Sequence, residues 1–244
     1  MSESTALDRL FAVASASPTL RACFGGDVFS FVIDAELDRI AAALNVHAGD
    51  VVLDIGCGTG GPGLAIAQRT GASLVGVDRS PAAVEVARAR GAANARFDVV
   101  DWPAAAGAHA GYHAVVSFDA LQLMNARAAL AGVTQALRPG ACFGFTSWEV
   151  PRHVVVPPQA EARVVRDWRA LLIECGFAVE SVVEPAGWRE RQLAVYKSMR
   201  EAAPALRAEL GDDVAALVLE EATQEPPRIE AGDMRRVVAI ARRK

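Results

Sequence analysis

The residues best suited to bind a ligand lie where an apolar run meets a glycine-rich one. Residues 51–55, VVLDI, are followed by GCGTGG at 56–61. Glycine permits a positive φ and lets a backbone approach a ligand closely, and a helix that follows offers unpaired N–H groups to a polar or anionic moiety. A tight turn needs one glycine, whereas this segment has four. The pattern therefore predicts a ligand-binding loop between a strand and a helix.

Two acidic residues bear on the kind of ligand. Asp78 lies about 20 residues beyond the loop, where an acid accepts hydrogen bonds from ribose hydroxyls, and Gly56-x-Gly58-x-x-Gly61 also fits the dinucleotide fingerprint. These features leave NAD and other nucleosides equally open. Asp54 stands inside the strand, two residues before Gly56, where a dinucleotide site usually keeps an apolar residue. A carboxylate there favours a ligand that carries positive charge.

Alternating strand-like and helix-like runs surround this loop. Such alternation indicates βαβ units, and hence an α/β fold with a doubly wound, mostly parallel sheet. The expected strands are 51–55, 73–77, 95–100, 114–118, 142–148, 177–183 and 234–241, and the expected helices are 35–44, 61–69, 81–90, 126–137 and 161–175. Residues 188–225 are expected to form a charged helical insertion that is broken by Pro226-Pro227.

Five segments, in this order, resemble those of the class I S-adenosylmethionine-dependent methyltransferases, of small-molecule, bacterial type. They are LDIGCGTGG (53–61), GVDRSP (76–81), RFDVVDWP (96–103), HAVVSFDALQLM (113–124) and LRPGACFGFTSWE (137–149). The resemblance implies a Rossmann-like sheet of seven strands, the last of which lies antiparallel beside the sixth. It also implies S-adenosylmethionine as the cofactor and S-adenosylhomocysteine as the product.

The same resemblance assigns contacts to that cofactor. It implies three carboxylate contacts: Asp54 at the methionine end, Asp78 at the ribose hydroxyls and Asp101 at the adenine amino group. The other contacts would be made by backbone atoms, or by packing near the base, at Gly56, Gly58, Gly60, Phe118, Arg79 and Trp102.

Contacts to the methyl acceptor are expected after strands four and five, because ligands of doubly wound sheets bind outside the carboxyl ends of the strands. Gln122, Met124 and Trp148 follow these strands. His153 as a base and Glu149, as a binder of a substrate amine or a partner of Arg152, are the candidate catalytic residues. Aromatic residues could close over a small, partly apolar acceptor or simply form core; they are Phe24, Phe29, Trp188 and Tyr196.

The composition and the motifs restrict the kinds of partner that we expect for this protein. The 244 residues are 52% apolar and 22% charged with a net charge of −4, as in an ordinary globular protein that repels phosphate backbones. The run after strand four, Ser117-Phe118-Asp119-Ala120, lacks the two prolines that hold a flipped base, so no nucleic-acid partner is expected. With no long apolar run, no secretory signal and no CxxC pair, we also expect no membrane span, no metal and a cytoplasmic location.

One domain, 1–244, is expected, with a helical cover at 1–48, a cofactor-binding core at 49–150 and a helical lid or insertion at 184–232. The predicted function is methyl transfer to an N, O or C atom of a small natural-product or quinone-like acceptor. Two alternatives stay open: a catalytically silent S-adenosylmethionine-binding protein and an NAD(P)-dependent oxidoreductase, against which Asp54 and the last strand argue. Both a monomer and a homodimer are compatible with the sequence.

Overall fold

Seven strands form one sheet in the computed structural model, which describes residues 3–26, 30–158 and 160–244. The order across the sheet is β3-β2-β1-β4-β5-β7-β6. The strands are β1 Val51–Ile55, β2 Ser73–Asp78, β3 Ala95–Val99, β4 Tyr112–Phe118, β5 Leu137–Glu149, β6 Phe177–Val183 and β7 Arg235–Arg243. The helices are α1 Glu3–Ala14, α2 Pro18–Phe24, α3 Asp34–Leu44, α4 Gly61–Thr70, α5 Pro81–Ala89, α6 Ala126–Ala136, α7 Trp168–Glu174, α8 Trp188–Glu201, α9 Ala203–Leu210 and α10 Asp212–Ala231, with short 3-10 turns at η1 Ala106–Ala108, η2 Leu121–Leu123 and η3 Glu161–Arg163.

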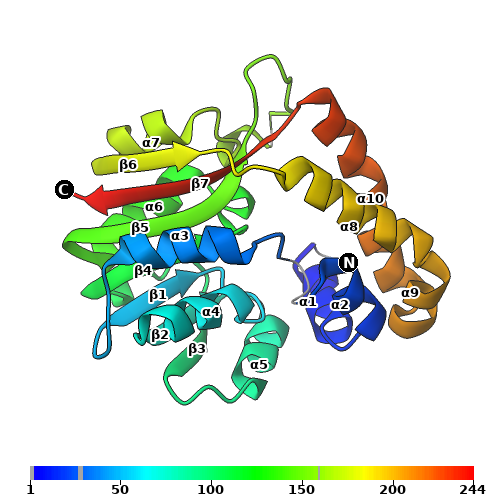
Figure 1. The fold of residues 1–244 in the computed structure, drawn as a ribbon, viewed down its shortest axis with the longest axis horizontal. Helices are drawn as coiled ribbons and strands as arrows, with labels where there is room; N and C mark the ends of the chain where they lie inside the picture. The colour runs from blue at the N-terminus through cyan, green and yellow to red at the C-terminus, as the bar shows by residue number, and fades with distance from the viewer. Residues whose placement is uncertain (1–2, 27–29, 159) are drawn as a thin grey trace.

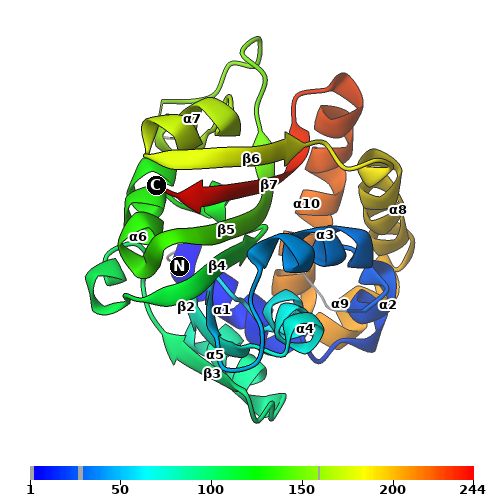
Figure 2. The same cartoon turned by 60° about the vertical axis from the view of Figure 1, so that its left-hand side comes forward.

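Helices cover both faces of the sheet, as the apolar character of its strands requires. Successive residues of β1 alternate between two apolar clusters: Leu53 packs with α6 and α7, whereas Val52 packs with α3, α4 and α5. Figures 1 and 2 show these two layers on either side of the sheet. The expected doubly wound α/β architecture is confirmed.

The last strand runs opposite to its neighbours. β7 lies between β5 and β6 and pairs antiparallel with both, from Cys142↔Arg242 to Glu149↔Arg235 on the β5 side. In Figure 1 the β7 arrow points away from the helices that the β6 arrow points toward. The expected antiparallel strand beside the sixth is therefore confirmed.

The chain's two helical regions meet beyond the carboxyl ends of the parallel strands. Helices α1 and α2 pack with α8, α9 and α10 around a third apolar cluster that contains Leu20, Trp188, Tyr196 and Val218. The Ser17 hydroxyl, which caps α2, also donates to Glu209 of α9 at 2.5 Å. Figure 1 shows these five helices gathered on one side of the sheet. None of the helices in the described ranges is long and apolar enough to cross a bilayer.

Two helix predictions were wrong. Pro226 and Pro227 lie inside α10, which continues to Ala231. A proline lacks the N–H that would bond the carbonyl four residues earlier. Here Arg200 of α8 donates to the carbonyl of Ala222, so this group keeps a partner and the helix continues.

The expected helix 161–175 begins only at Trp168. Before it, Arg166 donates to the carbonyls of Pro151 and Val154 at 2.8 and 2.9 Å, which ties Arg166 to the turn after β5, and Glu161–Arg163 form only a short 3-10 turn. The Asp167 side chain then caps the helix by accepting from the N–H of Ala170. The periodic apolar residues upstream were misread because the loop's tertiary contacts override them.

Candidate functional site

The glycine loop is wrapped around the end of β2. The N–H groups of Gly56 and Cys57 donate to the carbonyl of Val77 at 2.8 and 3.0 Å. The N–H of Gly58 donates to Asp78 Oδ2 at 2.9 Å, and Asp78 Oδ1 accepts from the N–H of Ser80 at 2.9 Å. Asp78 therefore joins the loop to the start of α5. Each carboxylate oxygen has a second lone pair through which it can accept from a ligand hydroxyl.

Three loop glycines have the left-handed backbone that favours this residue: φ is 68° at Gly56, 50° at Gly58 and 83° at Gly60. Gly56 is also the most crowded of the three, because a Cβ placed there would lie 2.5 Å from the Cβ of Ala120. Ala120 belongs to the segment after β4. The loop and that segment are therefore in direct contact, as a shared site requires.

We expect Gly56→Ala to lower the free energy of unfolding by about 2–4 kcal/mol, through left-handed strain of about 1 kcal/mol plus overpacking. Gly91→Ala is the matched control, since Gly91 has a φ of 65° and open space around its missing Cβ. The control should lose only about 1 kcal/mol. Urea unfolding followed by circular dichroism measures both values, and equal losses would contradict the crowding.

Asp54 is a buried carboxylate beneath the loop. Its residue is 1% exposed, and its Oδ1 atom has no hydrogen-bond partner among the described residues. Burial, and then the nearby charge of Asp78, raise the pKa of Asp54 to about 8. A buried carboxylate without a partner is costly, and a positively charged group would remove that cost. This arrangement fits the expectation of a cationic ligand.

The other residues expected at the cofactor follow the neighbouring strands. Arg79 after β2 and Asp101 after β3 are both exposed, and Phe118 at the end of β4 is buried. Trp102 lies elsewhere: its ring packs against Gly132 of α6, and its Nε1 donates to the carbonyl of Ala129 at 3.4 Å. The apolar core under α6 thus holds the indole, and the expected packing of Trp102 near the base stays a prediction.

Two expected acceptor contacts belong to the segment after β4. The Met124 methyl group lies 3.4 Å from where a Cβ of Gly56 would be, so this side chain borders the glycine loop. Gln122 folds back on its own turn, with Nε2 donating to the carbonyl of Asp119 at 2.5 Å and Oε1 accepting from Ser147 at 3.4 Å. Met124 is thus placed beside the loop, whereas Gln122 supports the turn.

The two candidate catalytic residues have other partners. Glu149 Oε1 accepts from the N–H of Trp168 at 2.8 Å, Oε2 lies 3.4 Å from Arg235, and burial raises the pKa of the carboxyl. Because side chains alternate along β5, Glu149 faces the α7 layer, opposite to Trp148. The expected catalytic role is corrected to a structural one at the first turn of α7.

His153 lies in the loop after β5, and its side chain is 67% exposed, 3.8 Å from Asp233. A general base must reach the proton it removes, in a site from which water is excluded. The imidazole is exposed in the ligand-free protein, and its role as a base stays a prediction.

The aromatic residues divide between the helical core and its inner boundary. Trp188 and Tyr196 are 2% and 1% exposed and lie in the third apolar cluster, which favours the core alternative. The half-buried Phe24 contacts Phe31, and Phe31 contacts Tyr196, with ring centroids 5.3 and 5.5 Å apart. Trp148 contacts Trp188 at 5.3 Å. The remaining aromatic prediction, Phe29, lies outside the described residues.

A buried ion network at this boundary was missed by the sequence analysis. Arg236 of β7 is 1% exposed; it lies 3.2 Å from Glu36 of α3 and 2.6 Å from Asp119, and its guanidinium lies over the Trp148 ring. Burial opposes its charge, but the two carboxylates hold the pKa of Arg236 above its usual value. Asp119 has a φ of 52° and also accepts from Thr146 and from the N–H of Phe31. The sequence did contain one signal for this network, which is the arginine at position 236 inside the apolar last strand.

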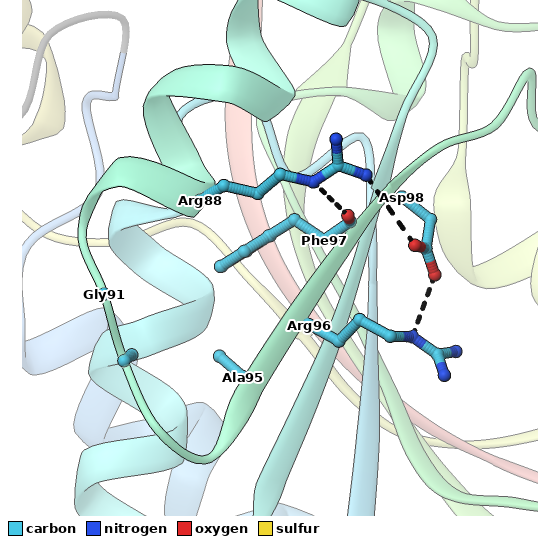
Figure 3. A pocket seen from close by; sticks show the side chains of 7 residues that line it. Arg88, Gly91, Ala95, Arg96, Phe97 and Asp98 are labelled. Atoms are coloured by element: carbon cyan, nitrogen blue, oxygen red, sulfur yellow. Dashed lines mark hydrogen bonds and ion pairs between the residues drawn. The ribbon is translucent and has the colours of Figure 1, made fainter.

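A hollow of about 270 Å³ lies between α5 and β3 (Figure 3). It is lined by residues 95–98 of β3, and one of these, Phe97, has its ring 3.0 Å from where a Cβ of Gly60 in the glycine loop would lie. Its charged groups are satisfied locally: Arg88 donates to the carbonyl of Phe97 at 2.8 Å, and Arg96 lies 2.9 Å from Asp98. The charged groups of the hollow therefore have partners without a ligand.

Residues 52–140 match a family model described as a methyltransferase domain. The demethylmenaquinone methyltransferase of Tropheryma whipplei (strain Twist) is 34% identical over 138 residues, which are 53% of this chain and 55% of that protein. The O-methyltransferase resE of Aspergillus sclerotiorum is 26% identical over 206 residues, 76% of this chain and 75% of that protein. The chain thus spans only about half the length of the first of these relatives.

Solved structures share the fold. A SAM-dependent methyltransferase from Thiobacillus denitrificans, in complex with S-adenosyl-L-homocysteine, has a TM-score of 0.66 and 20% identity over 94% of this chain and 100% of that one. The [4+2]-cyclase SpnF has a TM-score of 0.73 and 20% identity over 97% of this chain and 94% of that one. At such identities the likeness concerns the fold alone.

Proposed function

We propose, from the premise that this chain carries a domain of the class I S-adenosylmethionine-dependent methyltransferase family, that it transfers a methyl group to an N, O or C atom of a small, partly apolar metabolite. The ordered motifs and the matched residues 52–140 support the premise. The names of the relatives, demethylmenaquinone methyltransferase and O-methyltransferase, favour a quinone-like or natural-product acceptor. We also propose the division into a cover at 1–48, a core at 49–150 and an insertion at 184–232.

The observation that carries the proposal is the buried, unpartnered carboxylate of Asp54 under the glycine loop. S-adenosylmethionine is a cation with a sulfonium and an ammonium group, so it offers the positive charge that this carboxylate lacks. Asp78 is placed for hydroxyl groups at the end of β2. The residues present therefore fit this cofactor better than a dinucleotide, whose pyrophosphate would bring negative charge toward Asp54.

When bound, S-adenosylmethionine supplies a sulfonium-activated methyl group for an in-line displacement. The chain must align the acceptor atom and exclude water, and such alignment can contribute on the order of 7–11 kcal/mol. The Glu149 carboxylate is engaged with the N–H of Trp168, which argues against a role for it in this step. A neutral amine needs no base, whereas ionising a phenol of pKa about 10 at pH 7 costs about 4 kcal/mol.

Calorimetric titration with S-adenosylmethionine, S-adenosylhomocysteine and NAD(H) tests the cofactor class. We expect micromolar binding of the two sulfur nucleosides only, and a loss of about 100-fold in Asp78→Ala, because the variant removes the ribose acceptor and loosens the loop. Asp98→Ala is the matched control, since Asp98 pairs with Arg96 outside the site. Binding of NAD(H) instead would overturn the proposal.

Release of S-adenosylhomocysteine in the presence of acceptors tests turnover. It is expected with small aromatic or quinol acceptors. Cofactor binding without any release would favour the catalytically silent alternative.

A further inference from the structure

A buried amide on α8 has an unused hydrogen-bonding atom. Gln192 is 3% exposed, and its Oε1 has no hydrogen-bond partner in the part of the chain that the structure describes. Buried side-chain polar atoms are usually paired, so each exception calls for an explanation. Asp54 is another such exception and is accounted for by the cofactor. Gln192 lies on a different element and needs an account of its own.

A short hydrogen-bond chain fixes the orientation of this amide. The Tyr196 hydroxyl donates to Glu221 Oε1 at 3.0 Å and accepts from Gln192 Nε2 at 3.0 Å. A hydroxyl has one proton, and here that proton is directed at Glu221. The amide must therefore present its NH₂ group to Tyr196, which leaves Oε1 outside this hydrogen-bond chain and without a partner.

The neighbours of Gln192 on α8 show which part of the fold this helix face covers. Trp188, one turn earlier, contacts Trp148 at the end of β5, and Tyr196, one turn later, contacts Phe31. The N–H of Phe31 in turn donates to Asp119, directly after β4. This face of α8 therefore lies over the carboxyl ends of β4 and β5, where a doubly wound fold binds its substrate.

We propose that Gln192 is a specificity-determining residue whose Oε1 accepts a hydrogen bond from a hydroxyl or N–H group of the methyl acceptor. Trp148 and Phe31, whose rings contact the residues one turn before and one turn after Gln192, suit an aromatic body for that acceptor. The inference rests on the proposed function and narrows its substrate class to small aromatic compounds that carry a donor. A compound without the donor would leave Oε1 unpaired and should bind about tenfold more weakly.

Two probes of nearly equal size test whether binding depends on a hydrogen-bond donor. They are 2-naphthol, which has a donor, and 2-fluoronaphthalene, which has none. Equilibrium dialysis against the full chain saturated with S-adenosylhomocysteine measures both dissociation constants. We expect a preference of about tenfold for 2-naphthol in the wild type and nearly none in Gln192→Met. The exposed Gln224 of α10 supplies the matched control, and Gln224→Met should keep the full preference.

Two further measurements separate a specificity role from a structural one. Ligand-free Gln192→Met should melt close to the wild-type temperature, because the loss of the hydrogen bond to Tyr196 is offset by the removal of a buried acceptor that has no donor. Tyr196→Phe keeps the ring on Phe31 but frees the amide to turn, so the preference should fall there too. This second variant decides the matter if Gln192→Met does not fold.

Equal binding of the two probes to the wild type, no binding of either, or a preference that survives in both variants would overturn the inference. Calorimetry with S-adenosylhomocysteine accompanies each variant. Wild-type protein that does not bind this nucleoside contradicts the proposed function itself. Wild-type protein that binds it without any probe preference contradicts only the role of Gln192.

Discussion

Arg236→Met is expected to lower the free energy of unfolding by about 3–5 kcal/mol, because it leaves the buried Asp119 without its cation. Glu36 would keep only Arg191, which lies 3.5 Å away. Arg236 is 1% exposed and lies within hydrogen-bonding distance of both Glu36 and Asp119. Methionine keeps much of the apolar volume against Trp148, so the loss measures charge and hydrogen bonding more than packing. Urea unfolding at neutral pH, followed by circular dichroism, gives the value.

A neighbouring arginine on the same strand provides the control for this prediction. Arg242 of β7 pairs with Glu180 at the surface, where both side chains are partly exposed, and Arg242→Met should cost no more than about 1 kcal/mol. Adding Glu36→Gln and Asp119→Asn to Arg236→Met removes the stranded charges and should recover part of the loss. A loss below about 1 kcal/mol in Arg236→Met would show that the network does not hold the fold together.

The second large effect concerns pH and Asp54. The folded-state pKa of about 8 stands far above the ordinary aspartate value of 3.8, so the folded protein retains a proton that the unfolded chain releases. The contribution of this group to stability is fully present below about pH 4 and is lost as pH rises to about 8. At 1.36 kcal/mol per pKa unit, the ligand-free wild type should lose on the order of 4–6 kcal/mol relative to Asp54→Asn across that window.

Cofactor affinity should change in the opposite direction. A cationic ligand binds the ionised carboxylate, so wild-type affinity for S-adenosylmethionine should rise up to about tenfold per pH unit from pH 6 toward 8 and then level off. The ratio of wild-type to Asp54→Asn affinity, measured by calorimetry, removes the titration of the ligand itself. Asp213→Asn, at a side chain that is 83% exposed, should follow the wild type. A ratio that does not change with pH would show that Asp54 does not interact with the positive charge of S-adenosylmethionine.

The sequence predicted those features of the fold that local patterns encode. Strands such as 177–183 were located to the residue because apolar runs bounded by glycine are local signals. The glycine loop was recognisable for the same reason, since a positive φ at three positions within five residues calls for glycine wherever the chain leads next. Asp54 could be singled out because an acid inside an apolar strand is unusual in any context.

Contacts between distant segments were decided by the tertiary structure alone. Trp102 follows β3 next to Asp101, but the packing of α6 placed its ring in the core. Glu149 and Trp148 are adjacent in sequence but face opposite layers. Glu149 accepts a hydrogen bond from the first turn of α7, whereas the Trp148 ring lies under the guanidinium of Arg236. Helix α10 passes through Pro226 and Pro227, and Arg200, on another helix, supplies the donor that Pro226 lacks.

The sequence by itself therefore determined the positions of the strands, the glycine loop and the acid beneath it. All three depend on residues that are close together in the chain. Only the tertiary structure decided which polar side chains are buried together and which of their atoms remain unpaired. Glu36 and Arg236 are 200 positions apart, and Tyr196 and Glu221 are 25 apart. Desolvation and hydrogen-bond geometry at such sites depend on the packed fold, and no local pattern carries that information.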